Sequence, residues 1–180
     1  MQNDNLEALK FPIGKYVAPK TITDEHLQTW IATLEDFPER LTQIVASFND
    51  AQLDTPYRTG GWTIRQLVHH ISDSHHHSYT RFKWALTEDS PLIKAYAQKD
   101  WSNLFDAKSA PITLSLNHLN AVHAKLVYLL KGLSQEDLQK TFLHPEGNVT
   151  PTLAETVGLY AWHSSHHLAH IQNLVEREGW

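Results

Sequence analysis

The chain has 180 residues, of which 41% are hydrophobic, with a formal net charge of −5 and no cysteine. This length predicts one domain, residues 1–180, and the lack of cysteine excludes disulfides, thiolate metal ligands and a cysteine nucleophile. With no basic run, no signal peptide and no apolar run of ~20 residues, we expect a cytoplasmic protein that binds neither nucleic acid nor membrane.

Residues 1–21 are predicted to form an irregular arm that leads into a first helix over residues 24–48. Thr23 is a suitable N-cap, because its side chain can accept a hydrogen bond from the first turn. The apolar residues that follow keep helical spacing up to Phe48. Pro38 lies inside this segment and has no backbone N–H, so we expect it to kink or divide the helix.

A second helix is predicted over residues 64–86, after a Thr-x-x-Gln capping box that begins at Thr63. The following residues, 87–112, contain two prolines and several acids and predict a long loop with at most a helical turn. Long loops in compact domains often cover functional sites. We therefore expect pocket residues in this segment, including Tyr96 and Trp101.

Third and fourth helices are predicted over residues 113–133 and 153–178, the latter after a capping box that begins at Thr152. No segment has the alternation of a β-strand. Four amphipathic helices joined by loops predict an all-α protein, a four-helix bundle. The long gap between the second and third helices would allow a crossover connection in place of simple up-and-down order.

Histidine is unusually frequent, with 13 in the chain, and the run WHSSHHLAH contains His163, His166, His167 and His170. Residues four apart lie on one helix face, so His163 pairs with His167 and His166 with His170. Their places relative to the apolar stripe predict that the first pair points inward and the second towards solvent. Two imidazoles so placed can bind one metal ion, and imidazole suits zinc, nickel, copper or iron.

A second group of five histidines lies in the run HHISDSHHH of the predicted second helix. His75 falls in the apolar stripe and is predicted to point inward, whereas His69 and His76 are predicted to point outward. His70 lies on the flank of the stripe, in a row with positions 74, 77 and 81. Periodicity alone therefore favours His75 as the third ligand.

Three histidines would leave a divalent ion its full charge and an open coordination position, as in catalytic sites. Such an ion can lower the pKa of bound water or bind a thiol. The chain lacks His-Glu-x-x-His, and with it the glutamate base of that metalloprotease class. It also lacks Glu-x-x-His, which argues against a di-iron carboxylate bundle.

Four residues are candidates for proton transfer beside such a metal: His75, Asp73, Tyr160 and His123, which lies in the middle of the third helix's apolar stripe. A purely structural role, as a hydrogen-bonded core residue, is the alternative for His75 and His123.

Two segments resemble the metal-binding motifs of the DinB-like superfamily. GGWTIRQLVHHISDSHHHSYTRFK resembles the first motif, where the first histidine ligand follows a tryptophan by eight residues; counted from Trp62, this is His70. GLYAWHSSHHLAHI resembles the C-terminal motif, whose two ligands correspond to His163 and His167. FPIGKY, LDTPYRTGGW and the terminal EGW further resemble the YfiT-type branch of metal-dependent hydrolases.

The resemblance implies a four-helix bundle of up-down-down-up order, usually homodimeric, with the site at one end of the bundle. It implies one divalent metal per chain, zinc or sometimes nickel, held by His70, His163 and His167, and so selects His70 over His75. The family often has glutamine near the position of His170, so the histidine there is a departure.

Our first hypothesis is a metal-dependent hydrolase that activates water for attack on a small-molecule substrate, with His123 and Tyr160 as candidate catalytic residues. The second is a thiol S-transferase of the bacillithiol type, because members of the superfamily join low-molecular-weight thiols to electrophiles. The third is a non-catalytic metal-binding stress protein.

Overall fold

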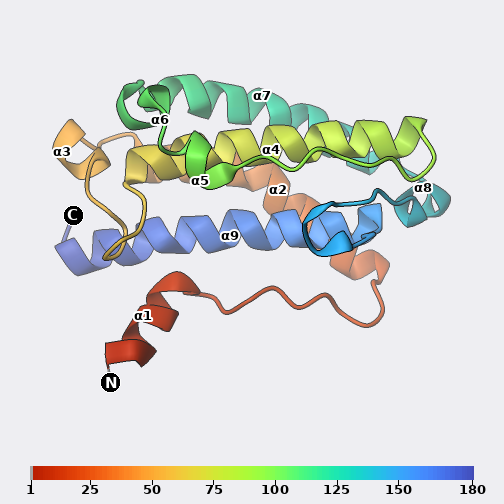
Figure 1. Cartoon of the computed structure of the whole chain (residues 1–180), viewed down its shortest axis with the longest axis horizontal. Coiled ribbons are helices and arrows are strands. Elements are labelled where there is room, and N and C mark those ends of the chain that lie inside the picture. Colours follow the sequence, from red (N-terminus) through yellow and green to blue (C-terminus); the bar gives the residue numbers. More distant parts are fainter. Residues whose placement is uncertain (1) are drawn as a thin grey trace.

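The computed structural model describes residues 2–180 and shows four long helices that lie side by side (Figure 1). They are α2 (Asp24–Val45), α4 (Ile64–Thr87), α7 (Ile112–Lys131) and α9 (Leu153–Glu178). Within this part of the chain no β-strand forms, and only isolated β-bridges join the loops. The predicted all-α four-helix bundle is confirmed. Nowhere in the described residues does a helix combine the length and apolar character that a membrane span requires.

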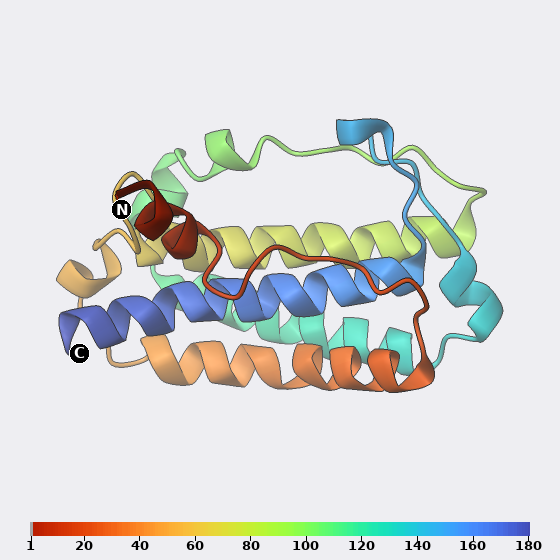
Figure 2. The same ribbon diagram turned by 90° about the horizontal axis from the view of Figure 1, so that it is seen from below.

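The helices follow the up-down-down-up order. α2 and α9 run in one direction along the bundle, and α4 and α7 run in the other (Figure 2). Because α4 and α7 are parallel neighbours, the chain must return along the whole bundle between them. The crossover does so, and it carries two short helices, α5 (Gln98–Trp101) and α6 (Phe105–Ser109), where at most a helical turn was predicted.

The capping signals in the sequence mark the beginnings of three of the four long helices, α2, α4 and α9. Thr63 accepts from the backbone N–H of Gln66 at 3.2 Å, and the Gln66 side chain accepts from the Thr63 N–H at 2.9 Å. Thr152 and Glu155 make the same reciprocal pair at the start of α9. Capping boxes of this kind satisfy backbone donors that have no partner within the helix.

The apolar core is divided into two clusters along the bundle. One cluster lies around Leu34, Phe82 and Val157, and the other lies around Ile71 and Ile171. Between them, the inward positions of α4, α7 and α9 carry polar side chains that are almost fully buried: His75, His123 and Ser164. The core therefore contains a central polar layer, which needs hydrogen-bond partners inside the protein.

Pro38 lies inside α2 and does not divide it, so of the two predicted effects, a kink or a division, the division is wrong. A proline at this position leaves the carbonyl of Leu34, four residues earlier, without its helical N–H partner. Nδ1 of His123 lies 2.6 Å from that carbonyl oxygen and replaces the missing donor. The bond from α7 thus satisfies a buried backbone group that the proline would otherwise leave without a partner.

The N-terminal arm is more ordered than the sequence predicted. Its first part forms α1 (Gln2–Lys10), and the residues that follow run along α9 in an extended conformation (Figure 2). The other short helices lie in the connections between long helices: α3 (Asp50–Leu53), α8 (Gln135–Gln139) and the 3₁₀ turn η1 (Glu146–Asn148). The arm covers a face of α9 that the bundle alone would leave exposed.

Candidate metal centre

Three predicted ligands meet in the central layer, where α4 faces α9. One ring nitrogen from each of His70, His163 and His167 lies within 4.8 Å of the other two. His70 and His167 are buried, and His163 is partly exposed to a cavity. Both His163 and His167 stand in the middle of α9, so the site lies partway along the bundle. The family resemblance had implied a site at one end.

The surroundings keep all three rings neutral at physiological pH. Burial lowers the pKa of His70 to about 4. Burial, reinforced by the neighbouring histidines, holds the pKa of His163 and of His167 well below the usual range. A neutral imidazole has one nitrogen lone pair available, and that is the form that binds a metal ion.

A chain of hydrogen bonds orients the ring of His163. Its first member is Nδ1 of His123, which must donate because the Leu34 carbonyl can only accept. Nε2 of His123 then accepts from Nδ1 of His75 at 2.8 Å. Nε2 of His75 in turn accepts from Nδ1 of His163 at 3.1 Å. The proton of His163 therefore sits on Nδ1, and its Nε2 carries a lone pair.

A second chain orients His167 in the same way. Nε2 of His170 donates to the carbonyl of Lys10 at 3.2 Å. Nδ1 of His170 is then an acceptor, and it lies 3.4 Å from Nδ1 of His167. His167 accordingly donates from Nδ1 and keeps the lone pair on Nε2. Metal-binding histidines usually have this arrangement, with the second ring nitrogen donating to an oriented acceptor.

The two chains leave Nε2 of His163 facing Nε2 of His167 at 3.1 Å. Two unprotonated nitrogens at this distance repel each other unless a cation lies between them. His70 completes the set: its Nδ1 lies 3.3 Å from the hydroxyl of Tyr96, and with that hydroxyl as the acceptor, Nε2 of His70 keeps its lone pair for a ligand. This donor set of neutral nitrogens fits a divalent ion such as zinc.

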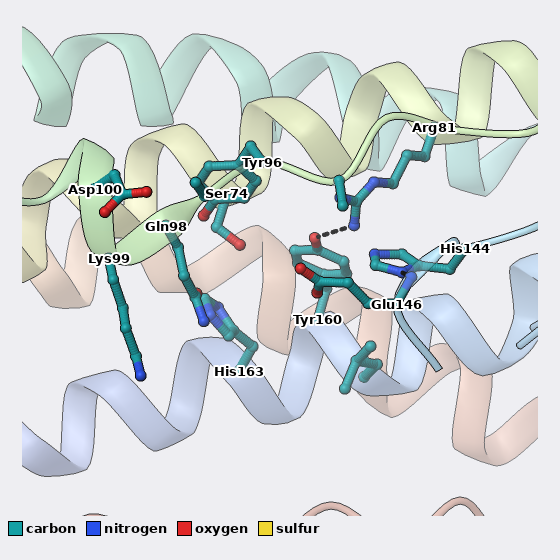
Figure 3. Close-up of a pocket in the computed structure, with 13 residues that line it drawn as sticks. Ser74, Arg81, Tyr96, Gln98, Lys99, Asp100, His144, Glu146, Tyr160 and His163 are labelled. Atoms are coloured by element: carbon teal, nitrogen blue, oxygen red, sulfur yellow. Dashed lines mark hydrogen bonds between the residues drawn. The ribbon is translucent and has the colours of Figure 1, made fainter. Parts of the chain in front are cut away.

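A cavity of about 470 Å³ opens beside His163 (Figure 3). α4, α9, the crossover and the turn around η1 all contribute to its wall. Its polar lining residues are Ser74, Arg81, Tyr96, Gln98, Lys99, Asp100, His144, Glu146, Tyr160 and His163. The expectation that the crossover supplies pocket residues holds for Tyr96, whereas Trp101 packs against the Tyr96 ring at 5.0 Å and does not line the cavity.

The candidates for proton transfer lie at different distances from this cavity. Tyr160 lines it, one helical turn before His163. His123 and His75 do not line it, and they reach His163 only through the hydrogen-bond chain. Asp73 is also absent from the lining, although burial raises its pKa to about 6. His75 and His123 are therefore connected to the site only through His163, whereas Tyr160 faces the cavity directly.

Three histidines that were predicted to face solvent are buried. His166 and His170 are only 7% and 3% exposed, because the arm and the loop before α4 cover this face of α9. Phe11 packs against His166 with ring centroids 6.0 Å apart, and Tyr57 packs against His170 at 4.2 Å. His69 is buried through hydrogen bonds to the crossover and to α7. Helical periodicity predicts only which face of a helix points into the bundle. It could not predict that the arm, the loop before α4 and the crossover also cover the outer faces.

Arg81 is a residue of the cavity that the sequence reasoning did not single out. The signal was present, since position 81 continues the row of 70, 74 and 77 on one flank of the second helix. Three of these positions, His70, Ser74 and Arg81, contribute to the candidate site.

An all-α bundle whose central layer presents three neutral imidazoles beside a cavity defines a helical metal-binding protein. The chain belongs to the DinB superfamily, whose family model it matches over residues 33–171. It is 50% identical over 172 residues to proteins of Bacillus cereus and Bacillus thuringiensis subsp. konkukian, each named "putative metal-dependent hydrolase". In both cases the match covers 96% of this chain and 98% of the relative.

The fold is likewise similar to a solved structure, that of YfiT from Bacillus subtilis. The TM-score is 0.94 at 46% sequence identity, and the match covers 96% of this chain and 99% of YfiT. That protein is described as a probable metal-dependent hydrolase with an unusual four-helix bundle topology. The names of these relatives and the histidine groups of this chain together imply metal dependence.

Proposed function

We propose that this protein is a metal-dependent hydrolase of a small-molecule substrate, with zinc bound by Nε2 of His70, His163 and His167. The observation that carries the proposal is the convergence of three neutral imidazoles, each with its Nδ1 directed to a hydrogen-bond partner, beside a cavity. An ion bound by these three residues would supply a Lewis acid, which favours the deprotonated form of water or of a thiol near neutral pH.

Other residues of the chain orient the three histidines and donate a proton to the substrate. His75 and His170 hold the ligand rings in one tautomer, so that little rearrangement accompanies metal binding. The hydroxyl of Tyr160 accepts a hydrogen bond from Arg81 at 3.3 Å, so its own proton remains free to be donated into the cavity. We infer that Tyr160 donates to the oxygen that gains negative charge as the substrate is attacked.

Transfer of a thiol to an electrophile is the second candidate. Among the described side chains no carboxylate is both buried and in the cavity: Asp73 is half-buried but does not line it, and Asp100 and Glu146 line it but are exposed. Water that attacks as hydroxide still holds a second proton, which must pass to the leaving group or to a base, whereas a thiolate holds none. The choice between the two nucleophiles is therefore open to a direct assay.

The ligand set is tested by metal content, measured by inductively coupled plasma mass spectrometry on untagged protein. We expect about one zinc per chain in the wild type, and loss of zinc in His70→Ala and His163→Ala. His76→Ala is the matched control, because this histidine lies on α4 but is exposed. Retention of zinc by the His163 variant would contradict the proposed ligand set.

Activity is tested on a panel of esters, amides and phosphoesters, with and without a thiol and a model electrophile. Hydrolysis that is lost in His163→Ala and reduced in Tyr160→Phe supports the hydrolase. Loss of the electrophile only when thiol is present, without hydrolysis, would assign the transferase. Zinc binding without turnover in either assay would leave a metal-binding protein with no catalytic role.

A further inference from the structure

Two arginines are buried on α4, and they differ in whether a carboxylate balances their charge. Arg65, 6% exposed, donates to Asp54 at 2.8 Å and to Asp50 at 2.7 Å, so two carboxylates balance its charge. Arg81, 8% exposed, forms no ion pair with any described residue. Burying a guanidinium without a counter-charge is costly, so the difference points to a partner from outside the chain.

The contacts of Arg81 leave most of its hydrogen-bonding capacity unused. Nη1 donates to the hydroxyl of Tyr160 at 3.3 Å, which is a neutral acceptor. Nε is shielded from solvent and has no hydrogen-bond partner. A guanidinium has five N–H donors arranged to meet the oxygens of a carboxylate or phosphate. A ligand that reaches these donors must do so from the cavity that Arg81 lines.

That cavity also contains the proposed metal ligand His163 (Figure 3). Arg81 contacts Tyr160, which lies three residues before His163 on the same face of α9. One helical turn is about 5 Å long. A single small molecule can therefore contact Arg81 with one end and approach Nε2 of His163 with the other.

We propose that Arg81 binds an anionic group of the substrate, a carboxylate or a phosphate, while the reacting bond lies at the three histidines. The substrate class is thus small anionic esters, amides or phosphoesters whose charge lies a few bonds from the reacting centre. The substrate class rests on the proposed function. Binding of an anion at Arg81 does not, because it can be measured without turnover.

The other charged residues of the cavity are exposed and lie on its rim: Lys99, Asp100 and Glu146. Lys99 adds a second positive charge for an anion. Glu146 is a rival partner for Arg81 from within the chain, since it lines the same cavity and η1 belongs to a loop. If Glu146 balanced Arg81 in solution, Glu146→Gln would lower the melting temperature, whereas loss of a solvent-exposed glutamate without a partner would leave it unchanged.

The first experiment measures anion binding by isothermal titration calorimetry on the full-length protein with its zinc. Benzoate and phenylphosphonate are the probes, and benzamide is the neutral control. We expect Arg81→Met to weaken binding of at least one anion roughly 10- to 100-fold. Arg65→Met serves as the matched buried-arginine control and should bind as the wild type does. Equal anion binding by wild type and Arg81→Met, or no binding of either anion, overturns the subsite.

Thermal melting separates a ligand-binding role from a structural one. Arg81→Met removes a buried charge that has no counter-charge, so its melting temperature should equal or exceed that of the wild type. Arg65→Met should melt at a lower temperature, because it removes the hydrogen bonds that the Arg65 guanidinium donates to Asp54, Asp50 and the carbonyl of Ala110. A loss in Arg81→Met as large as that in Arg65→Met, or the same loss in Glu146→Gln, would make Arg81 a structural residue.

The second experiment compares hydrolysis of two esters that differ only in a carboxylate placed a few bonds from the ester. We expect kcat/KM to favour the anionic ester, and Arg81→Met to abolish that preference, measured as the ratio of kcat/KM for the two esters. Arg81 also donates to Tyr160, but an effect of the substitution on Tyr160 acts on both esters and cancels in this ratio. Hydrolysis without such a preference contradicts the substrate class and leaves the hydrolase standing. Anion binding at Arg81 without hydrolysis contradicts the hydrolase and leaves the subsite standing.

Discussion

The bond from His123 to the backbone of α2 predicts an energetic coupling between two residues that are 85 positions apart. Pro38 leaves the Leu34 carbonyl without its helical partner, and Nδ1 of His123 replaces that partner at 2.6 Å. Substituting His123→Leu removes the replacement in a part of the core where Leu34 is fully buried. Substituting Pro38→Ala supplies a backbone N–H at position 38 and restores the helical donor.

The magnitude follows from counting the groups that lose a partner. His123→Leu leaves the Leu34 carbonyl and the Nδ1–H of His75 unsatisfied. Each such buried group costs about 1–3 kcal/mol, so the free energy of unfolding should fall by about 2–6 kcal/mol. In that background Pro38→Ala repairs the carbonyl alone. The double-mutant cycle should therefore show a favourable coupling of about 1–3 kcal/mol.

Equilibrium urea unfolding of the four proteins, in the presence of a chelator, measures this coupling. The packing of Pro38 and its intrinsic effect on the helix are common to both backgrounds, so they cancel in the cycle. Equal slopes of free energy against urea would show that the denatured states are comparable. A coupling below about 0.5 kcal/mol would refute the account, because Pro38 and His123 would then act independently.

Three further predictions concern the ligands, the pH dependence and the arm. His75→Phe, which removes the acceptor for Nδ1 of His163, should weaken zinc binding about 10- to 100-fold in chelator competition, while His76→Ala leaves it unchanged. In the metal-free protein, His70 has its ordinary pKa of about 6.5 when the chain is unfolded, whereas burial lowers the pKa of His70 to about 4 in the folded state. The contribution of His70 to stability is therefore complete above pH 6.5 and is lost as the pH falls towards 4, by up to about 1.4 kcal/mol per pH unit. Burial likewise lowers the pKa of His123 and of His170, whereas the raised pKa of Asp73 has the opposite effect on stability. The histidines outnumber Asp73, so the free energy of unfolding should fall with pH. Urea unfolding that does not change between pH 6.5 and pH 4.5 would contradict the reasoning. Finally, a Cβ at Gly158 would lie 2.5 Å from the hydroxyl of Tyr16, so Gly158→Ala should displace the arm and speed its proteolysis; an unchanged cleavage rate would show that the arm accommodates the methyl group.

The sequence by itself determined the long helices and the three candidate ligands. Capping residues such as Thr63 and Thr152 act through local hydrogen bonds, and apolar spacing acts through the face that each helix buries. The choice of His70 over His75 came from the family resemblance. Periodicity correctly placed His75 inside, but it could not show that His75 lies behind His163, outside the group of three rings that His70 joins.

Only the tertiary structure decided how the histidines are connected. Three features depend on segments that are far apart in the chain. They are the bond from His123 to Leu34, the burial of His166 and His170 under the arm, and the buried position of Arg81 without a counter-charge. Helical periodicity relates residues within one element, because neighbouring turns present the same face. The partner of a buried polar group is set by which elements pack together, so the contacts of the site could be read only once the bundle, arm and crossover were assembled.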